Sequence, residues 1–148
     1  MQLTIFRTLW GVTTPWQQTV SELKSVGCGG IEARVPLIPE EQQTLARRLQ
    51  ESALEYIAIV FSGGGVIPAQ ADTPRQHLER LKGRFDDAKA LNPRFVNLLA
   101  GNDRWPLAQQ VDFLGQAHEL AAAYELTCSF ETHRATSLYS PWLTLEII

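Results

Sequence analysis

Short runs of apolar, β-prone residues alternate along the chain with longer stretches whose apolar residues recur at helical spacing. The short runs predict strands over residues 3–10, 30–35, 55–62, 95–100 and 126–133. The longer stretches predict helices over 15–26, 39–52, 74–91 and 107–124, and a last one over 143–148. Thr14 is expected to cap the first helix, with Pro15 at its first position. Strands alternating with longer helices indicate crossover connections and therefore a parallel sheet.

Two α/β architectures have this order of elements: a doubly wound open sheet, and part of a (β/α)8 TIM barrel. A complete barrel typically needs about 250 residues. The 148 residues of this chain suffice for about five of the eight strand–helix units. The predicted fold class is therefore α/β, a partial (β/α)8 TIM barrel of about five parallel strands with flanking helices.

Composition supports one globular domain over residues 1–148, because 45% of the residues are hydrophobic and 20% are charged. No apolar run is long enough to span a membrane, and the first residues do not resemble a signal peptide. The net charge of −3 argues against a surface for nucleic acid. Cys28 and Cys128 are expected to be free thiols of a cytoplasmic protein.

Polar and aromatic residues gather where the predicted strands end, at the edge that carries the active site in parallel α/β folds. Alternation along the fifth strand puts Glu131 and His133 on one face, with Thr127 and Ser129, and Cys128, Phe130 and Thr132 on the other. Glu131 and His133 could both reach a metal ion or a sugar hydroxyl. The strand-end residues are Trp10, Glu32, Arg34, Ser62, Asp103, Trp105, Glu131 and His133.

Simpler interpretations exist for several of these residues. Glu32 and Arg34 could form an ion pair at the strand end. The glycines at 63–65 match no nucleotide-binding motif and are expected to form a flexible loop near a ligand. Of the two histidines within helices, we predict that His118 is partly buried and that His77 is solvated.

Several segments taken together resemble the xylose isomerase-like TIM barrels, a superfamily of sugar isomerases, sugar phosphate isomerases and epimerases that includes endonuclease IV. These segments are Leu9-Trp10-Gly11, Gly29-Gly30-Ile31-Glu32, Asn97-Leu98-Leu99-Ala100-Gly101-Asn102-Asp103 with Trp105, Phe130-Glu131-Thr132-His133-Arg134, and Leu138-Tyr139-Ser140-Pro141-Trp142. The resemblance covers essentially the whole chain.

The resemblance implies a divalent metal, Mn²⁺, Mg²⁺, Co²⁺ or Zn²⁺, that holds the oxygens of a sugar or sugar phosphate while carboxylates move a proton between adjacent carbons. It implies Glu131 as a metal ligand, and His133, on the same strand face, is a possible further ligand. The residues that it implies for substrate binding are Trp10, Glu32, Asp103, Trp105, His133 and Arg134.

The chain also departs from the family pattern. The remaining metal ligands of the family come from strands six to eight, and Ser62 and Gly101 stand near the places where the nuclease branch has histidines. We therefore predict a sugar isomerase or epimerase-like protein whose catalytic site is incomplete in the lone chain. A non-catalytic binding or assembly module is the alternative. Because a partial barrel leaves two sheet edges open and its inner face exposed to water, we also predict a homodimer, formed through those edges or by C-terminal exchange.

Overall fold

The computed structural model describes residues 3–147, in which five strands alternate strictly with five helices. The strands are β1 (Phe6–Thr8), β2 (Gly30–Arg34), β3 (Glu55–Phe61), β4 (Phe95–Leu99) and β5 (Cys128–Phe130). The helices are α1 (Trp16–Ser25), α2 (Pro39–Ser52), α3 (Pro74–Ala90), α4 (Leu107–Ala123) and α5 (Pro141–Ile147). Every predicted element is present, although residue 148 of the last predicted helix lies outside the described residues.

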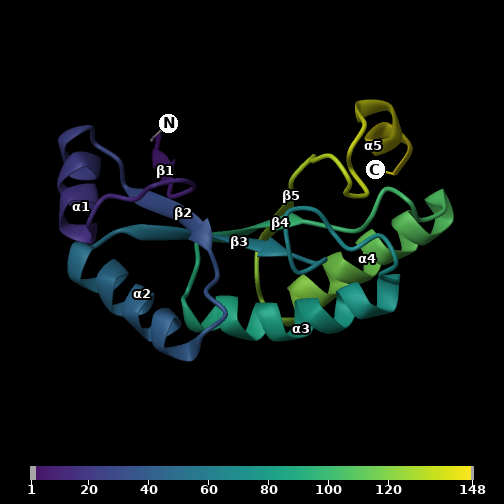
Figure 1. Cartoon of the computed structure of the whole chain (residues 1–148), viewed down its shortest axis with the longest axis horizontal. Helices are drawn as coiled ribbons and strands as arrows, with labels where there is room; N and C mark the ends of the chain where they lie inside the picture. Colours follow the sequence, from purple (N-terminus) through teal and green to yellow (C-terminus); the bar gives the residue numbers. More distant parts are fainter. Residues whose placement is uncertain (1–2, 148) are drawn as a thin grey trace.

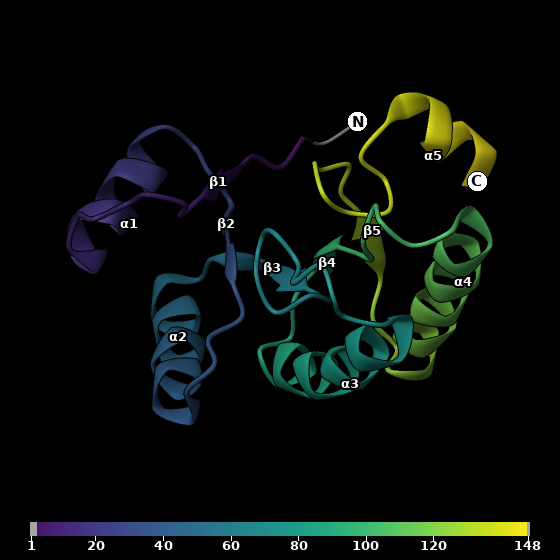
Figure 2. The same ribbon diagram turned by 45° about the vertical axis from the view of Figure 1, so that its right-hand side comes forward.

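All five strands are parallel and lie side by side in their order along the chain. A doubly wound sheet would reverse its strand order at a switch point, whereas a barrel adds each strand beside the previous one. Figures 1 and 2 show α1 to α4 following one another along the same, outer side of the sheet. The fold is therefore the predicted part of a TIM barrel.

The element boundaries differ from the prediction mainly at the two outer strands. Strands β1 and β5 are three residues long, much shorter than the predicted ranges 3–10 and 126–133. Each has a single neighbour in the sheet, so that its length is set by pairing on one side only. Helix α1 begins at Trp16 after Pro15, and the Thr14 hydroxyl lies 2.8 Å from that of Thr19 instead of capping the helix.

The hydrophobic core fills the space between the outer face of the sheet and the helices. Alternate residues of the central strands point into it, among them Ala58, Val60, Val96 and Leu98. The helices contribute the fully buried Leu23, Leu81, Phe85 and Phe113. Helix α3 is held at its start by a capping box between Thr73 and Gln76. None of the helices in residues 3–147 combines the length and hydrophobicity of a membrane-spanning segment.

The opposite, concave face of the sheet is less exposed than predicted. Ile57, Ile59 and Leu99 lie on this face, and their exposed fractions are 6%, 8% and 5%. The larger Trp10 and Phe61 line the same cavity as Ile59 on this face. The expectation of an inner face exposed to water is therefore wrong for these three residues.

Candidate functional site

A cavity of about 230 Å³ opens on the concave side, at the carboxyl ends of the strands. It receives side chains from β1, from the middle of β2, from β3 and β4, and from residues that follow β1, β3 and β5. Four of the residues predicted from the sequence as site residues line it: Trp10, Glu32, Glu131 and His133. The remaining lining is Thr8, Ile59, Phe61, Val66 and Leu99, so that two carboxylates and an imidazole border a largely apolar space.

Asn97, in the middle of β4, connects the two carboxylates. Its Nδ2 atom donates to Oε2 of Glu131 at 2.7 Å and to Oε1 of Glu32 at 3.2 Å. The sheet register explains the arrangement, because Asn97 lies beside Ser129 on β5 and beside Ile59 on β3, on the face that Glu32 shares. An amide carries two N–H donors, so one neutral side chain can satisfy both acids.

The face assignment predicted for the fifth strand agrees with the structure. Cys128 and Phe130 pack against the core cluster, whereas Ser129 and Glu131 lie on the side of Asn97. Burial raises the pKa of the Cys128 thiol to about 11, so this cysteine is protonated at neutral pH and is a poor nucleophile. The polar and ionisable side chains of this segment that could contact a ligand therefore lie on the concave side of the sheet.

The backbone after β5 sets the protonation pattern of His133. Its Nδ1 lies 2.8 Å from the carbonyl oxygen of Arg134, which can only accept, so Nδ1 carries the proton. In the neutral imidazole, Nε2 is then free to accept a hydrogen bond or to bind a metal. The Thr136 hydroxyl donates to the carbonyl of His133 at 2.6 Å and fixes this turn.

The structure does not bring the other three predicted residues to the cavity. Trp105 is buried, and its indole N–H donates to the carbonyl of Asp72 at 2.8 Å. Asp103 is half-buried in the turn after β4, where its backbone N–H donates to Ala135 at 3.4 Å. Arg134 is exposed. Their assignment to substrate binding stays a prediction from the sequence.

A buried polar network lies behind the cavity, between the ends of β3 and β4 and helix α3. The Ser62 hydroxyl is 2.9 Å from Nδ1 of His77 and accepts the backbone N–H of Gly101, also at 2.9 Å. Ser62 and His77 are both fully buried. This network ties two strand ends to the helix that covers them.

The two helical histidines have the reverse of their predicted environments. His77 is buried, with the rings of Trp105 and Phe113 at 4.7 and 5.8 Å, whereas His118 is exposed. The prediction was wrong because helical spacing alone does not say which polar residue meets a buried partner such as Ser62. The pKa of His77 is lowered to about 4: burial is the largest cause, the charge of Arg80 also lowers the pKa, and Asp72 opposes the change.

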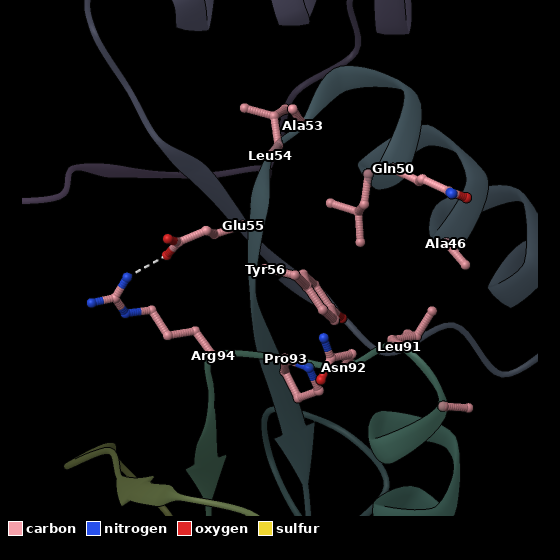
Figure 3. Close-up of a pocket in the computed structure, with 12 residues that line it drawn as sticks. Ala46, Gln50, Ala53, Leu54, Glu55, Tyr56, Leu91, Asn92, Pro93 and Arg94 are labelled. Atoms are coloured by element: carbon pink, nitrogen blue, oxygen red, sulfur yellow. Dashed lines mark hydrogen bonds and ion pairs between the residues drawn. The ribbon is translucent and has the colours of Figure 1, made fainter.

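A larger cavity lies at the other end of the sheet and does not combine these groups. It measures about 610 Å³ and lies between α2 and the loop that leads into β4 (Figure 3). Two of its polar side chains already have partners: Glu55 pairs with Arg94, and the Tyr56 hydroxyl donates to the carbonyl of Ala33 at 2.9 Å. The amino-terminal end of a barrel generally serves stability. The smaller cavity around Glu131 is therefore the better candidate site.

The described residues do not form the metal site that the family implies. Within residues 3–147, no group of three or more His, Cys, Asp or Glu side chains converges in a way that could hold a metal ion. One oxygen of Glu131 and one of Glu32 are already bound to Asn97. The other oxygens and Nε2 of His133 border the same cavity but do not converge as the three protein ligands of a catalytic zinc site do.

Comparison with known proteins agrees with the fold. The family model described as xylose isomerase-like TIM barrel matches residues 20–148. A comparison with curated protein sequences gives no significant match.

Three solved structures are similar to this chain. An L-ribulose 3-epimerase has a TM-score of 0.71 at 17% identity, covering 99% of this chain and 56% of its own. The IolI protein with a bound zinc atom has a TM-score of 0.68 at 15% identity, covering 99% and 58%. A D-allulose 3-epimerase from Methylomonas sp. in complex with D-allulose has a TM-score of 0.66 at 15% identity, also covering 99% and 58%. The chain thus spans little more than half the length of these structures, and the likeness shows a shared fold.

Proposed function

This chain belongs to the xylose isomerase-like TIM barrel family, and from that premise we propose that it binds a small sugar in the cavity bordered by Glu32 and Glu131. The proposed role is that of the substrate-binding part of a sugar isomerase or epimerase. The observation that carries the proposal is the pair of hydrogen bonds from Asn97, at 2.7 and 3.2 Å, that holds both carboxylates at one cavity.

Carboxylate oxygens suit a polyhydroxylated ligand, because each hydroxyl group of a sugar can donate to them. Hydrogen bonds to charged groups are the stronger kind, at about 1.5–3 kcal/mol each. Trp10 lines the same cavity and is 59% exposed, so its indole ring is accessible to the apolar C–H face of a sugar ring. The D-allulose complex of a structural neighbour supports this ligand class.

The reactive chemistry available to the described residues is proton transfer. A carboxylate beside a bound ketose can accept a proton from the carbon next to the carbonyl, as in general base catalysis. The carbonyl oxygen would then need a partner for its developing negative charge. Because the described residues provide too few converging metal ligands for that purpose, we expect sugar binding without turnover from the lone chain.

Titration of the protein with D-allulose, followed by calorimetry or by NMR, tests the proposal. Glu131→Gln and Glu32→Gln should each weaken binding at least about fivefold, because each removes a charged acceptor. Glu55→Gln is the matched control, since Glu55 is a strand glutamate paired with Arg94 at the other end of the sheet. Absence of D-allulose binding, or an equal loss in the control, would contradict the proposed function.

Turnover is tested separately by deuterium incorporation into D-allulose in D₂O. We expect no incorporation above that of buffer for the chain alone. Incorporation that Glu131→Gln abolishes would show that the chain by itself is a complete enzyme and would replace the binding role with a catalytic one.

We also propose that the protein forms a homodimer in a cytoplasmic setting. Strands β1 and β5 each pair on one side only among the described residues. On α5, Trp142 is 79% exposed and Leu145 is 67% exposed, and such apolar surface favours association. Light scattering should give the mass of a dimer, and Trp142→Lys with Leu145→Lys should shift it to that of a monomer. A monomer for the unaltered chain would contradict the proposal.

A further inference from the structure

The wall of the candidate cavity offers several hydrogen-bond acceptors and few donors. Glu32 and Glu131 each have one carboxylate oxygen that no side chain of residues 3–147 holds, and Nε2 of His133 is free to accept. Among the side chains that line the cavity, the remaining donors are the Thr8 hydroxyl and the Trp10 indole N–H. A ligand group that suits this wall therefore brings several donors and needs few in return.

Two negative charges border the cavity without an ion pair. Among residues 3–147, neither Glu32 nor Glu131 has a cationic side chain within ion-pair distance. By contrast, Glu22 and Asp72, which are also half-buried, each pair with an arginine. The donor that Glu32 and Glu131 share is the amide of Asn97, which is neutral and leaves both charges in place.

The two carboxylates are also held close together. Both accept from the same nitrogen, Nδ2 of Asn97, at 3.2 Å for Glu32 and 2.7 Å for Glu131. Like charges at such short range repel, most strongly where water is partly excluded. A cation bound between them would remove this repulsion, and an ammonium group could donate to both free oxygens at once.

The cationic side chain that follows Glu32 on the same strand does not neutralise it. Cζ of Arg34 lies 4.3 Å from the ring centroid of Trp10 and 4.7 Å from that of Phe61. The ion pair between Glu32 and Arg34 that the sequence left open is not formed among the described residues. Trp10 and Phe61 line the cavity, whereas Arg34 does not, so the cavity keeps its negative charge.

The remaining wall favours an organic cation. Aromatic ring faces attract ammonium groups, and the attraction grows where water is excluded. Trp10 and Phe61 supply such rings, and the buried Ile59 and Leu99 make the rest of the wall apolar. An ammonium group attached to a sugar ring combines a charge for the carboxylates with C–H groups for this apolar surface.

We propose that the ligand of this cavity is an amino sugar in its cationic form, with the ammonium group between Glu32 and Glu131 and the ring against Trp10. The inference rests on the proposed function and narrows its ligand class from sugars to amino sugars. A protonated amine brings three donors and a positive charge, whereas a hydroxyl group brings one donor and no charge. Glu32 and Glu131 are thus assigned as the residues that select an amine over a hydroxyl.

The test compares D-glucosamine with D-glucose and N-acetyl-D-glucosamine in calorimetric titrations of the full chain at about pH 6.5, where a sugar amine is protonated. These sugars share one ring and differ in the group on C2. The unaltered protein should bind D-glucosamine about tenfold or more tightly than either neutral sugar, because hydrogen bonds between charged groups are the stronger kind. Equal affinity for the three sugars would overturn the inference without the use of any variant.

Variants assign the preference to residues. Glu32→Gln and Glu131→Gln should each reduce the preference for D-glucosamine at least about threefold, because each removes one negative charge. Glu55→Gln, at a glutamate paired with Arg94 outside this cavity, should retain the preference. A preference that survives in both Glu32→Gln and Glu131→Gln would also overturn the inference.

Further outcomes separate this inference from the proposed function. If D-allulose binding depends on Glu131 but D-glucosamine is not preferred, the proposed function stands and the assignment to amino sugars is wrong. If D-glucosamine binding depends on both glutamates while D-allulose does not bind, the ammonium site stands and the proposed function fails. Methylammonium that binds as tightly as D-glucosamine would show a general cation site and would overturn the assignment to a sugar.

Discussion

Asn97 on β4 donates a 2.7 Å hydrogen bond to Glu131, a residue 34 positions further along the chain. The same nitrogen reaches Glu32 at 3.2 Å, across a separation of 65 positions. A single neutral amide thus satisfies two acids on the concave face. This arrangement makes Asn97 central to both the stability and the ligand binding of the site.

Asn97→Asp should destabilise the protein at neutral pH. It replaces the shared donor with a third carboxylate, and we expect a loss of about 1–3 kcal/mol in the free energy of unfolding at pH 7. The loss should shrink near pH 4, where carboxylates begin to take up protons. Urea unfolding at pH 7 and at pH 4 measures this loss in the free energy of unfolding. Asn92→Asp, at an exposed position, should have little effect, and equal stability of Asn97→Asp and the unaltered protein would contradict the expectation.

Ser62→Ala should be destabilising although it removes one oxygen atom. The substitution leaves the Gly101 N–H and Nδ1 of His77 without partners in a buried place. Each unpaired group costs roughly 1–3 kcal/mol. Chemical denaturation checks the loss, with Ser25→Ala as control because the Ser25 hydroxyl is exposed and bonds only the carbonyl of Glu22. A change below about 0.5 kcal/mol would mean that water replaces the hydroxyl.

Stability should fall with acid because of His77. Its pKa is lowered from 6.5 to about 4 in the folded protein, so the unfolded chain binds the proton more tightly between these values. The contribution of His77 to the free energy of unfolding is complete above pH 6.5. It is lost as the pH falls toward 4, and the total loss is on the order of 3 kcal/mol.

Urea midpoints between pH 7 and pH 4 should show this dependence on His77. His77→Asn places an amide nitrogen near Nδ1 and removes the titration, so its stability should change less over the same range. A pH dependence identical to that of the unaltered protein would assign the acid sensitivity to the carboxylates instead.

Gly101→Ala should be among the most damaging small substitutions. Gly101 has a φ of +76°, and an added Cβ would lie 2.0 Å from Oγ and 2.8 Å from Cβ of the fully buried Ser137. Strain and overpacking together predict a loss of roughly 2–4 kcal/mol. Gly115→Ala is the control, since nothing lies within 4 Å of a Cβ there and the position is inside α4. The control should gain about 0.5–1 kcal/mol.

Metal binding by the lone chain should be weak. Glu32, Glu131 and His133 line the candidate cavity, but Asn97 holds one oxygen of each carboxylate, and no group of three or more such side chains within residues 3–147 could hold a metal ion. Calorimetric titration of demetallated protein with Mn²⁺ or Zn²⁺ should show no stoichiometric binding at micromolar concentrations. Tight binding that disappears in Glu131→Ala would contradict this and would mean that a further ligand reaches the cavity.

Sequence pattern was informative where the deciding interactions are local. Alternation with period two placed Glu131 on one face of its strand and Cys128 on the other, because neighbouring side chains of a strand point to opposite faces. The sequence pattern predicted the wrong environment for His77. The buried His77 is hydrogen-bonded to the Ser62 hydroxyl, and helical spacing does not reveal a partner that lies 15 positions away. Asn97 was part of a motif, but nothing in its neighbours along the chain marks it as a partner of two acids.

The sequence by itself determined the alternation of strands and helices, the parallel sheet that follows from crossover connections, and the strand segments that carry Glu32 and Glu131. Only the tertiary structure decided that the strands lie in chain order, that Asn97 joins those two carboxylates, and that Arg34 is held by Trp10 and Phe61 without an ionic partner. The physical reason is that backbone periodicity depends on adjacent residues. Contacts across the sheet depend instead on register and curvature, which many distant residues set together.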